Sequence, residues 1–234
     1  MIYANPTKAY LSVLESLVDW PENNVSPRDQ ATRELVDHLF HVERPEATPI
    51  VTLDEERNAV IRKYQGEELR LYLTGETRAS VWAAQASSFW AKIANPDGKI
   101  NSNYGQLIWY KLSLPEGRCP WDWARHKLLT DPSTRQAYVR FSLPEHQWDG
   151  NKDQVCTMHM NFLIRDDHMQ GTVVMRSCDI VKGLVYDMPF FCYLVQRMAL
   201  DLMLPVGTFG FFCHSLHLYE RDLPTALKML GRKS

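Results

Sequence analysis

Residues 155–187 constrain the fold of this chain more than any other stretch. They read VCTMHMNFLIRDD followed by HMQGTVVMRSCDIVKGLVYD. Over 155–165 and 172–179 the side chains alternate between two faces, as they do along β-strands. Residues 186–204 then form an apolar run with the length of a buried helix. The stretch therefore predicts two paired strands, joined by a turn at Gly171, and a helix that packs against them.

The remaining segments predict further helices and strands. Periodicity and turn residues place helices at 7–19, 55–73, 77–94 and 121–129, strands at 33–42, 135–142 and 208–219, and loops at 21–29 and 95–105. A chain of 234 residues is long enough to bury a substantial core, and no linker divides it. We therefore expect a single domain, residues 1–234, of the α+β class with one main sheet.

Charge and composition narrow the classes of partner. A net charge of -2 gives no general attraction to nucleic acid or to a membrane surface, so an anionic ligand must be met by a local site. No apolar run approaches the roughly 20 residues of a membrane span, and the start, MIYANPTKAY, does not resemble a secretion signal. The 5 cysteines form no CxxC pair, which favours a reduced, cytoplasmic chain. The scattered histidines have no metal-ligand spacing, so no metal site is predicted.

Cys156 and the Arg176-Ser177 pair are the first candidates for chemistry. An intracellular cysteine is usually inert, and it becomes a nucleophile where a cationic neighbour lowers the thiol pKa. Arg176, on the neighbouring predicted strand, is placed to supply that charge. With Ser177 it offers a guanidinium fork and a hydroxyl suited to a phosphate, although a plain surface arginine is the alternative. His217 and Tyr219 share one strand face and suit either a sugar hydroxyl or a polar role in the core.

The joint spacing of these residues resembles the thymidylate synthase family, in its nucleotide-hydroxymethylase branch, over about residues 26–222. The pattern consists of Cys156, Arg-Ser-x-Asp at 176–179, Gly183, Leu184, Tyr186, His-x-Tyr at 217–219, Glu68 in a Leu-rich helix ending at Gly75, and Trp90 fourteen residues before Tyr104-Gly105. The loop GKINSNYGQLIW and the strand VCTMHMNFLIRD are similar to those of phage deoxycytidylate hydroxymethylases.

This resemblance implies a thymidylate-synthase-like mixed sheet flanked by helices, with one sheet face in a homodimer interface and active sites shared between subunits. It also implies roles for individual residues. Cys156 would be the nucleophile, and Glu68 and Tyr104 would serve proton and water chemistry. The 5′-phosphate would be bound by Arg28, Arg176 and Ser177, and Arg135 would reach the phosphate of the partner subunit. The sugar 3′-hydroxyl would be bound by His217 and Tyr219, Asp179 would contact the base and the folate, and Trp90 and Glu68 would border the folate.

The implied reaction begins when a thiolate adds to C6 of a pyrimidine, which makes C5 nucleophilic. C5 then takes a one-carbon unit from 5,10-methylenetetrahydrofolate, leaving an exocyclic methylene. Water adds to that methylene to give a hydroxymethyl group, or hydride from the folate gives a methyl group. The resemblance favours water, and so a folate-dependent dCMP 5-hydroxymethyltransferase that makes a modified nucleotide for DNA synthesis, in the host cytoplasm if the chain is phage-encoded.

Asp187 indicates which base is bound. Methylating synthases have Asn at this place, and its amide matches O4 and N3–H of uracil. A carboxylate instead accepts a hydrogen bond from the amino group of cytosine and favours protonation of N3. Leaving a buried donor or acceptor unmatched costs about 1–3 kcal/mol, so Asp187 predicts a cytosine nucleotide. The alternative role for Asp187 is the N-cap of the helix that follows.

Several positions depart from the family pattern. Gln136 stands where a second arginine usually follows Arg135, Thr157 replaces a histidine, Asn161 replaces a glutamine, and the C-terminal LPTALKMLGRKS lacks the apolar tail that covers folate. Water entering under an incomplete lid favours hydroxymethylation. Three alternatives remain: a dCMP 5-methyltransferase, a CMP 5-hydroxymethylase, and a non-catalytic nucleotide- or RNA-binding relative that would not need the thiol.

Overall fold

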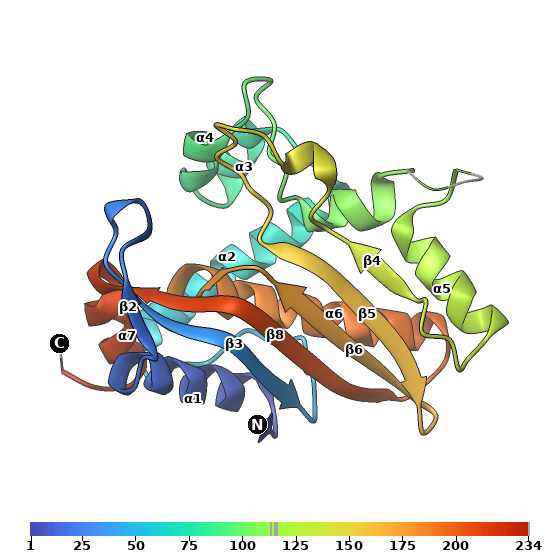
Figure 1. Cartoon of the computed structure of the whole chain (residues 1–234), viewed down its shortest axis with the longest axis horizontal. Coiled ribbons are helices and arrows are strands. Elements are labelled where there is room, and N and C mark those ends of the chain that lie inside the picture. The colour runs from blue at the N-terminus through green and yellow to red at the C-terminus, as the bar shows by residue number, and fades with distance from the viewer. Residues whose placement is uncertain (113, 115–116, 234) are drawn as a thin grey trace.

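A mixed β-sheet with helices packed on one face forms the body of the molecule, as a computed structural model shows (Figure 1). The structure describes residues 1–112, 114 and 117–233. The strands are β1 (Ile2–Tyr3), β2 (Asn23–Val25), β3 (Thr32–Val42), β4 (Tyr138–Arg140), β5 (Thr157–Arg165), β6 (His168–Met175), β7 (Cys178–Asp179) and β8 (Val206–Tyr219). The helices are α1 (Pro6–Asp19), α2 (Glu55–Thr74), α3 (Ala79–Gln85), α4 (Phe89–Ile93), α5 (Pro120–Thr130), α6 (Val185–Asp201) and α7 (Leu223–Met229).

The strand order is β1-β3-β8-β6-β5-β4, with β2 paired to β3 and β7 paired to β8. β3 and β8 form a long antiparallel pair that runs from Thr32 opposite Tyr219 to Val42 opposite Phe209. β6 and β7 both run parallel to β8, whereas β5 is antiparallel to β6. The sheet is therefore mixed, and the predicted α+β architecture is confirmed.

The core lies between the sheet and the helices α1, α2 and α6, which are behind the sheet in Figure 1. Alternation along β3 and β8 points Phe40 and Phe211 inward, where their rings stack with centroids 5.0 Å apart. α6 is apolar on most sides and buries nearly all of its length, as its sequence predicts. On the opposite face of the sheet, Val36 and Leu39 of β3 are exposed, across from Ser215 and Phe212 of β8.

The predicted turn at Gly171 is wrong. The β5–β6 turn lies at Asp166 and Asp167, which adopt φ values of 50° and 60°, and aspartate is one of the residues that tolerate this left-handed region. Gly171 sits inside β6, opposite Phe162. A Cβ there would lie 2.6 Å from a methyl of Val195, so glycine is required because α6 packs directly on the strand.

Other differences concern the ends of elements. The loop predicted at 21–29 contains β2, which pairs with β3, and a 3-10 turn at Pro27–Asp29. The helix predicted over 77–94 is divided into α3 and α4 by a break at residues 86–88. The strand predicted over 172–179 is interrupted at Arg176 and Ser177 before β7. A short π-helix, Ile180–Leu184, precedes α6. The interruption at residues 176–177 matters most, because it lies beside Cys156.

Candidate active site

Cys156 lies one residue before β5 and is partly exposed, whereas the other four cysteines are buried. Arg176 lies across from it, and its backbone N–H donates to the Cys156 carbonyl at 2.9 Å. The Arg176 guanidinium donates to the carbonyls of Gln154 at 2.6 Å and Val155 at 3.1 Å, and its Nη2 is 3.6 Å from the Cys156 sulfur. The predicted proximity of thiol and guanidinium is therefore present.

The positive charge of Arg176 lowers the pKa of the Cys156 thiol, as predicted, but it does not set the net shift. Burial raises the pKa of the Cys156 thiol above 9.0, and the positive charges of Arg176 and Arg28 only partly oppose this. The carboxylates of Asp187 and Asp153 raise the thiol pKa further. Because desolvation outweighs the two arginines, the free chain holds a thiol rather than a thiolate at neutral pH. A nucleophilic Cys156 therefore needs a group that takes its proton.

Arg28 reaches the site from the loop between β2 and β3. It is exposed and has φ 53° and ψ 41°, in the left-handed region, and Asp29 beside it has φ 59°. Two consecutive non-glycine residues in this region are unusual, and such strain clusters at functional sites. Arg28 is close enough to Cys156 to affect the thiol pKa. Both guanidinium groups therefore act on the pKa of the thiol, and Arg176 is the one in direct contact with the sulfur.

Ser177, Asp179 and His217 meet where β7 pairs with β8. The Ser177 hydroxyl is 3.5 Å from Nδ1 of His217, and Asp179 lies opposite His217 in the strand register. The ring of Tyr219 contacts that of His217, with centroids 5.1 Å apart. The structure thus brings together residues that the sequence spaces forty positions apart.

Glu68 is a buried carboxyl on the stripe of α2 that faces the core. Neighbours on that stripe are Ile61, Leu71 and Tyr72, at the spacing of successive helical turns. Burial, reinforced by the charge of Asp187, raises the pKa of Glu68 to about 8.

Trp90 is linked to this carboxyl by two successive hydrogen bonds through Tyr64. Its indole N–H donates to the Tyr64 hydroxyl at 3.0 Å, and that hydroxyl donates to Oε1 of Glu68 at 3.2 Å. The chain of donors holds the Glu68 carboxyl in one orientation.

Asp187 projects from the first turn of α6 into the same region. It is partly exposed, and its Oδ2 is 4.0 Å from the Cys178 sulfur. Burial, with repulsion from Asp179, raises the pKa of Asp187 to about 7. The alternative role as N-cap is excluded, because Leu184 occupies that position, without a side-chain hydrogen bond. Asp179 instead caps the preceding π-helix by accepting hydrogen bonds from the backbone of Val181 and Lys182.

Tyr104 is buried in an aromatic layer. Its ring stacks on Tyr72, with centroids 5.4 Å apart, and contacts Phe141 and Phe191. Burial raises the pKa of the Tyr104 phenol, and the charges of Asp187 and Cys156 raise it further. A neutral phenol that feels both groups lies within the same electrostatic site.

A small cavity of about 40 Å³ adjoins Glu68. It is lined by Ala47, Gln65, Glu68, Leu69, Tyr72, Tyr186, Pro189, Phe190 and Tyr193. The side-chain oxygen of Gln65 is buried and has no hydrogen-bond partner among the described residues. Aromatic walls with a few converging polar groups are typical of sites for flat heterocycles.

Comparison with known proteins agrees with this geometry. The family model of thymidylate synthase matches residues 8–234. The chain belongs to the thymidylate synthase family. It is 28% identical over 170 residues to the deoxycytidylate 5-hydroxymethyltransferases of Enterobacteria phages T4 and T2, covering 68% of this chain and 68% of each relative. The structure of thermostable thymidylate synthase A from Bacillus subtilis superposes with a TM-score of 0.75 at 15% identity, over 99% of this chain and 86% of that chain.

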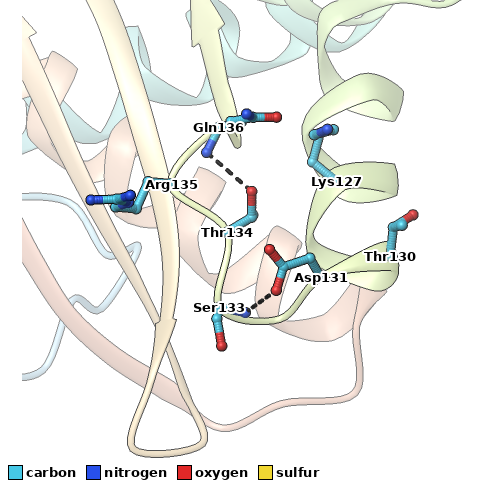
Figure 2. A pocket seen from close by; sticks show the side chains of 7 residues that line it. All are labelled: Lys127, Thr130, Asp131, Ser133, Thr134, Arg135 and Gln136. Carbon is cyan, nitrogen blue, oxygen red and sulfur yellow. Dashed lines mark hydrogen bonds between the residues drawn. The ribbon is translucent and has the colours of Figure 1, made fainter.

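Arg135 is the one predicted residue of this thymidylate synthase family member that the structure does not bring to the site. It is exposed on the loop after α5, where residues 127–136 line a pocket of about 270 Å³ and its guanidinium points away from α5 (Figure 2). The neighbouring Ala137 is bonded to Phe162, six residues along β5 from Cys156. At about 3.3 Å per residue, this separates Arg135 from Cys156 by roughly 20 Å within one chain.

Sequence reasoning missed Tyr64, Gln65 and Asp153. Tyr64 precedes Glu68 by one helical turn, so the spacing alone was a usable signal. Gln65 and Asp153 have no such local signal, because both are placed by tertiary contacts. Among residues 1–112, 114 and 117–233, no group of three or more His, Cys, Asp or Glu side chains is arranged to hold a metal ion. In the same part of the chain, no helix is both long and apolar enough to cross a membrane.

Proposed function

We propose that this thymidylate synthase family member is a folate-dependent dCMP 5-hydroxymethyltransferase. The observation that carries the proposal is the carboxyl of Asp187, which lies in one site with Cys156 and Glu68 and is not used to cap its helix. The similarity to phage deoxycytidylate 5-hydroxymethyltransferases supports the same assignment.

Asp187 would read the base. Its pKa of about 7 means that the carboxyl changes charge near neutral pH. An ionised carboxylate accepts from the amino group of cytosine and favours protonation of N3, which completes a second hydrogen bond. Opposite uracil it would face the weakly basic O4 acceptor with no hydrogen between them. An unmatched buried acceptor costs about 1–3 kcal/mol, which favours cytosine by about fivefold to a hundredfold.

Cys156 would add to C6 of the base, and Arg176 would hold both the thiol and the phosphate. Two of the three guanidinium nitrogens of Arg176 already donate to the protein, while Nη1 makes no hydrogen bond to the described residues and remains free for a phosphate oxygen. Arg28 and Ser177 would complete the phosphate contacts. His217 and Tyr219, at the end of β8, would bind the sugar 3′-hydroxyl.

Glu68 and Tyr104 would move protons. A carboxyl whose pKa is about 8 is mostly protonated at neutral pH and can both donate and accept a proton during a catalytic cycle. Glu68 therefore suits protonation of the base or activation of water, and the neutral Tyr104 phenol suits donation of a hydrogen bond to a water or to the base.

The residues around the cavity at Glu68 suit 5,10-methylenetetrahydrofolate in their chemistry. Tyr186, Phe190 and Tyr193 offer aromatic surface, and the unpaired oxygen of Gln65 offers an acceptor for a ring N–H. At about 40 Å³ the cavity must widen to admit a pterin. When bound, this folate supplies a one-carbon unit at the oxidation level of formaldehyde.

The last step would use water rather than hydride. After α7, Arg232 pairs with Asp19 at 2.7 Å and with Glu15 at 2.5 Å, so the described C-terminal residues are held against α1 and not over Glu68. This placement supports access of water to the site. A dCMP 5-methyltransferase, with hydride as the final reactant, is the alternative that shares every other feature.

Two copies of the chain would form a homodimer with shared sites. Arg135 lies too far from Cys156 to act in its own subunit, which supports a contact with the partner's phosphate. The open face of the sheet exposes Val36 and Leu39, apolar side chains that a second copy would cover.

The reaction is tested by incubating purified protein with methylenetetrahydrofolate and dCMP, dUMP or CMP. Products are measured by mass spectrometry, and dihydrofolate is measured by absorbance. We expect dCMP to gain CH2O without dihydrofolate formation. A gain of CH2 with dihydrofolate would show a methyltransferase, reaction of CMP would show a ribonucleotide enzyme, and no product from any nucleotide would favour a binding protein.

A further inference from the structure

Asp153 is a buried carboxylate that no step of the proposed reaction uses. It precedes Cys156 by three residues, and it is only 4% exposed. Its Oδ2 accepts from the backbone N–H groups of Asn101 at 2.5 Å and Ser102 at 2.9 Å, and its Oδ1 accepts from the Ser102 hydroxyl. Hydrogen bonds to an ionised acceptor are among the strong ones. The carboxylate is therefore committed to the loop at 101–102 and not available to a ligand.

The backbone of Asp153 makes the same connection a second time. Its carbonyl accepts from the side-chain amide of Asn101 at 3.0 Å, and that amide also donates to Asn151 at 3.3 Å. Asn151 in turn accepts from the Asp153 N–H at 2.9 Å. The loop at residues 101–102 and the loop at residues 151–153 are thus joined by both side-chain and backbone contacts around one buried carboxylate, and we call this contact the junction.

On one side, this junction leads directly to the nucleophile. Only Gln154 and Val155 separate Asp153 from Cys156, and the carbonyls of both residues are held by the Arg176 guanidinium. The segment from Asp153 to Cys156 is therefore fixed at each residue, and the position of the sulfur follows the position of Asp153.

On the other side, the junction leads to Tyr104 and to the helix that carries Glu68. Asn103, next to Ser102, donates through its side-chain amide to the carbonyls of Leu71 at 3.1 Å and Glu76 at 2.7 Å, at the end of α2. A Cβ at Gly105 would lie 1.9 Å from the Tyr72 carbonyl, so the backbone beside Tyr104 packs directly on that helix.

We propose that Asp153 is a positioning residue that fixes the Cys156 segment against the segment carrying Tyr104, and so sets the distance between the nucleophile and the proton-transfer groups. The inference rests on the proposed function for the roles of those groups. Misplacement of reacting groups by about 1 Å can cost roughly a hundredfold in rate. A single carboxylate that holds both segments therefore has a large effect on turnover without contacting the substrate.

Asp153 has a second, separable effect through its charge. The carboxylate raises the pKa of the Cys156 thiol. Asp153→Asn keeps the size of the side chain, removes the charge, and replaces one acceptor oxygen with a donor that faces other donors. The variant should therefore lower the thiol pKa while disturbing the geometry. Replacing a residue that only stabilised the fold would not produce a lower thiol pKa together with a lower kcat.

The test combines steady-state kinetics with the pH profile of Cys156 alkylation by iodoacetamide, measured on the Cys156 peptide by mass spectrometry. For Asp153→Asn we expect kcat for dCMP to fall at least about tenfold with KM changed less than about threefold, and the alkylation profile to move to lower pH. Ser102→Ala, which removes one hydrogen bond and keeps the charge, should lower kcat with the alkylation profile unchanged.

Asp149→Asn is the matched control, because Asp149 is an exposed acid in the same loop, and it should leave both measurements unchanged. A wild-type kcat in Asp153→Asn and Ser102→Ala would overturn the proposal, as would loss of kcat in Asp153→Asn with an unmoved alkylation profile. If the wild type converts no nucleotide, the proposed function fails. The alkylation profiles then test the link between Asp153 and Cys156 without kinetic data, and an Asp153→Asn profile equal to that of wild type refutes this link.

Discussion

Replacing Glu68 with glutamine tests how much stability the chain loses by burying a carboxyl near Asp187. The pKa of Glu68 rises from 4.5 to about 8 on folding. Between these values the folded state holds a proton that the unfolded state has released, so stability falls as pH rises. The contribution from the protonated group is complete below about pH 4.5 and is lost once the pH passes about 8. Glutamine has no such proton to lose.

The interval between 4.5 and about 8 sets the size of the effect. At 1.36 kcal/mol per pH unit it corresponds to an upper value of about 5 kcal/mol. Relaxation of the surroundings and entry of water around the charge reduce such penalties, so we expect about 2–4 kcal/mol. The Tyr64 hydroxyl can still donate to the glutamine oxygen, which keeps the local hydrogen bond in the variant.

Urea unfolding at pH 5 and pH 8.5 measures the effect. The free energy of unfolding of Glu68→Gln, relative to wild type, should increase by about 2–4 kcal/mol between the two pH values. Glu67→Gln is the control, since Glu67 is a more exposed carboxylate on the same helix, paired with Arg70 at 3.2 Å, and its difference from wild type should change by less than about 1 kcal/mol. Parallel pH dependence of wild type and Glu68→Gln would refute the reasoning.

Three further predictions concern the nucleotide and the assembly. Cys156→Ala should abolish turnover but still bind dCMP by calorimetry, because the phosphate contacts remain; retained turnover would remove Cys156 as the nucleophile. Arg176→Ala should raise KM for dCMP and also lower kcat, because this guanidinium holds the carbonyls of residues 154 and 155 as well; normal kinetics would place the phosphate elsewhere. Light scattering should find a dimer. Mixing inactive Cys156→Ala with inactive Arg135→Ala should restore part of the activity, because one site of the mixed dimer then has both residues intact. An active monomer would contradict the shared site.

The order and bounds of most elements along the chain were predictable because long periodic segments dominate it, whereas the strand order of the sheet was not predicted. α1, α2, β3, α5, α6 and β8 each have an apolar pattern that outweighs local propensity, and each lies close to its predicted range. Gly171 was misjudged because glycine signals both turns and close packing. Only the position of Val195 on α6, more than twenty residues away, decides between them.

The pKa values in the site were harder to predict than which residues form it. The proximity of Arg176 to Cys156 follows from strand pairing, and it was predicted correctly. The lowering effect of Arg176 on the pKa of the Cys156 thiol was also predicted. The net rise of that pKa was not predictable, because burial is a property of the whole fold and here exceeds the effect of the arginines. Asp153 was missed for the same reason, since its partners at residues 101 and 102 lie in a different loop.

The raised pKa of Asp187 gives the base preference a pH dependence. A protonated carboxyl can donate to N3 of cytosine or to O4 of uracil and accept from the adjacent N–H in either case, so it discriminates weakly. The ionised form accepts from the cytosine amino group, and N3 of cytosine is basic enough to share a proton with the carboxylate. With uracil it accepts from N3–H, but O4 is a weak base and stays opposed to the second carboxylate oxygen. Since the pKa of Asp187 is about 7, the ratio of kcat/KM for dCMP to that for dUMP should rise between pH 6 and pH 8. One unmatched acceptor corresponds to a rise of about fivefold or more. Asp187→Asn should favour dUMP, with a ratio that does not vary with pH. A ratio in the wild type that is equally flat would mean that Asp187 does not read the base.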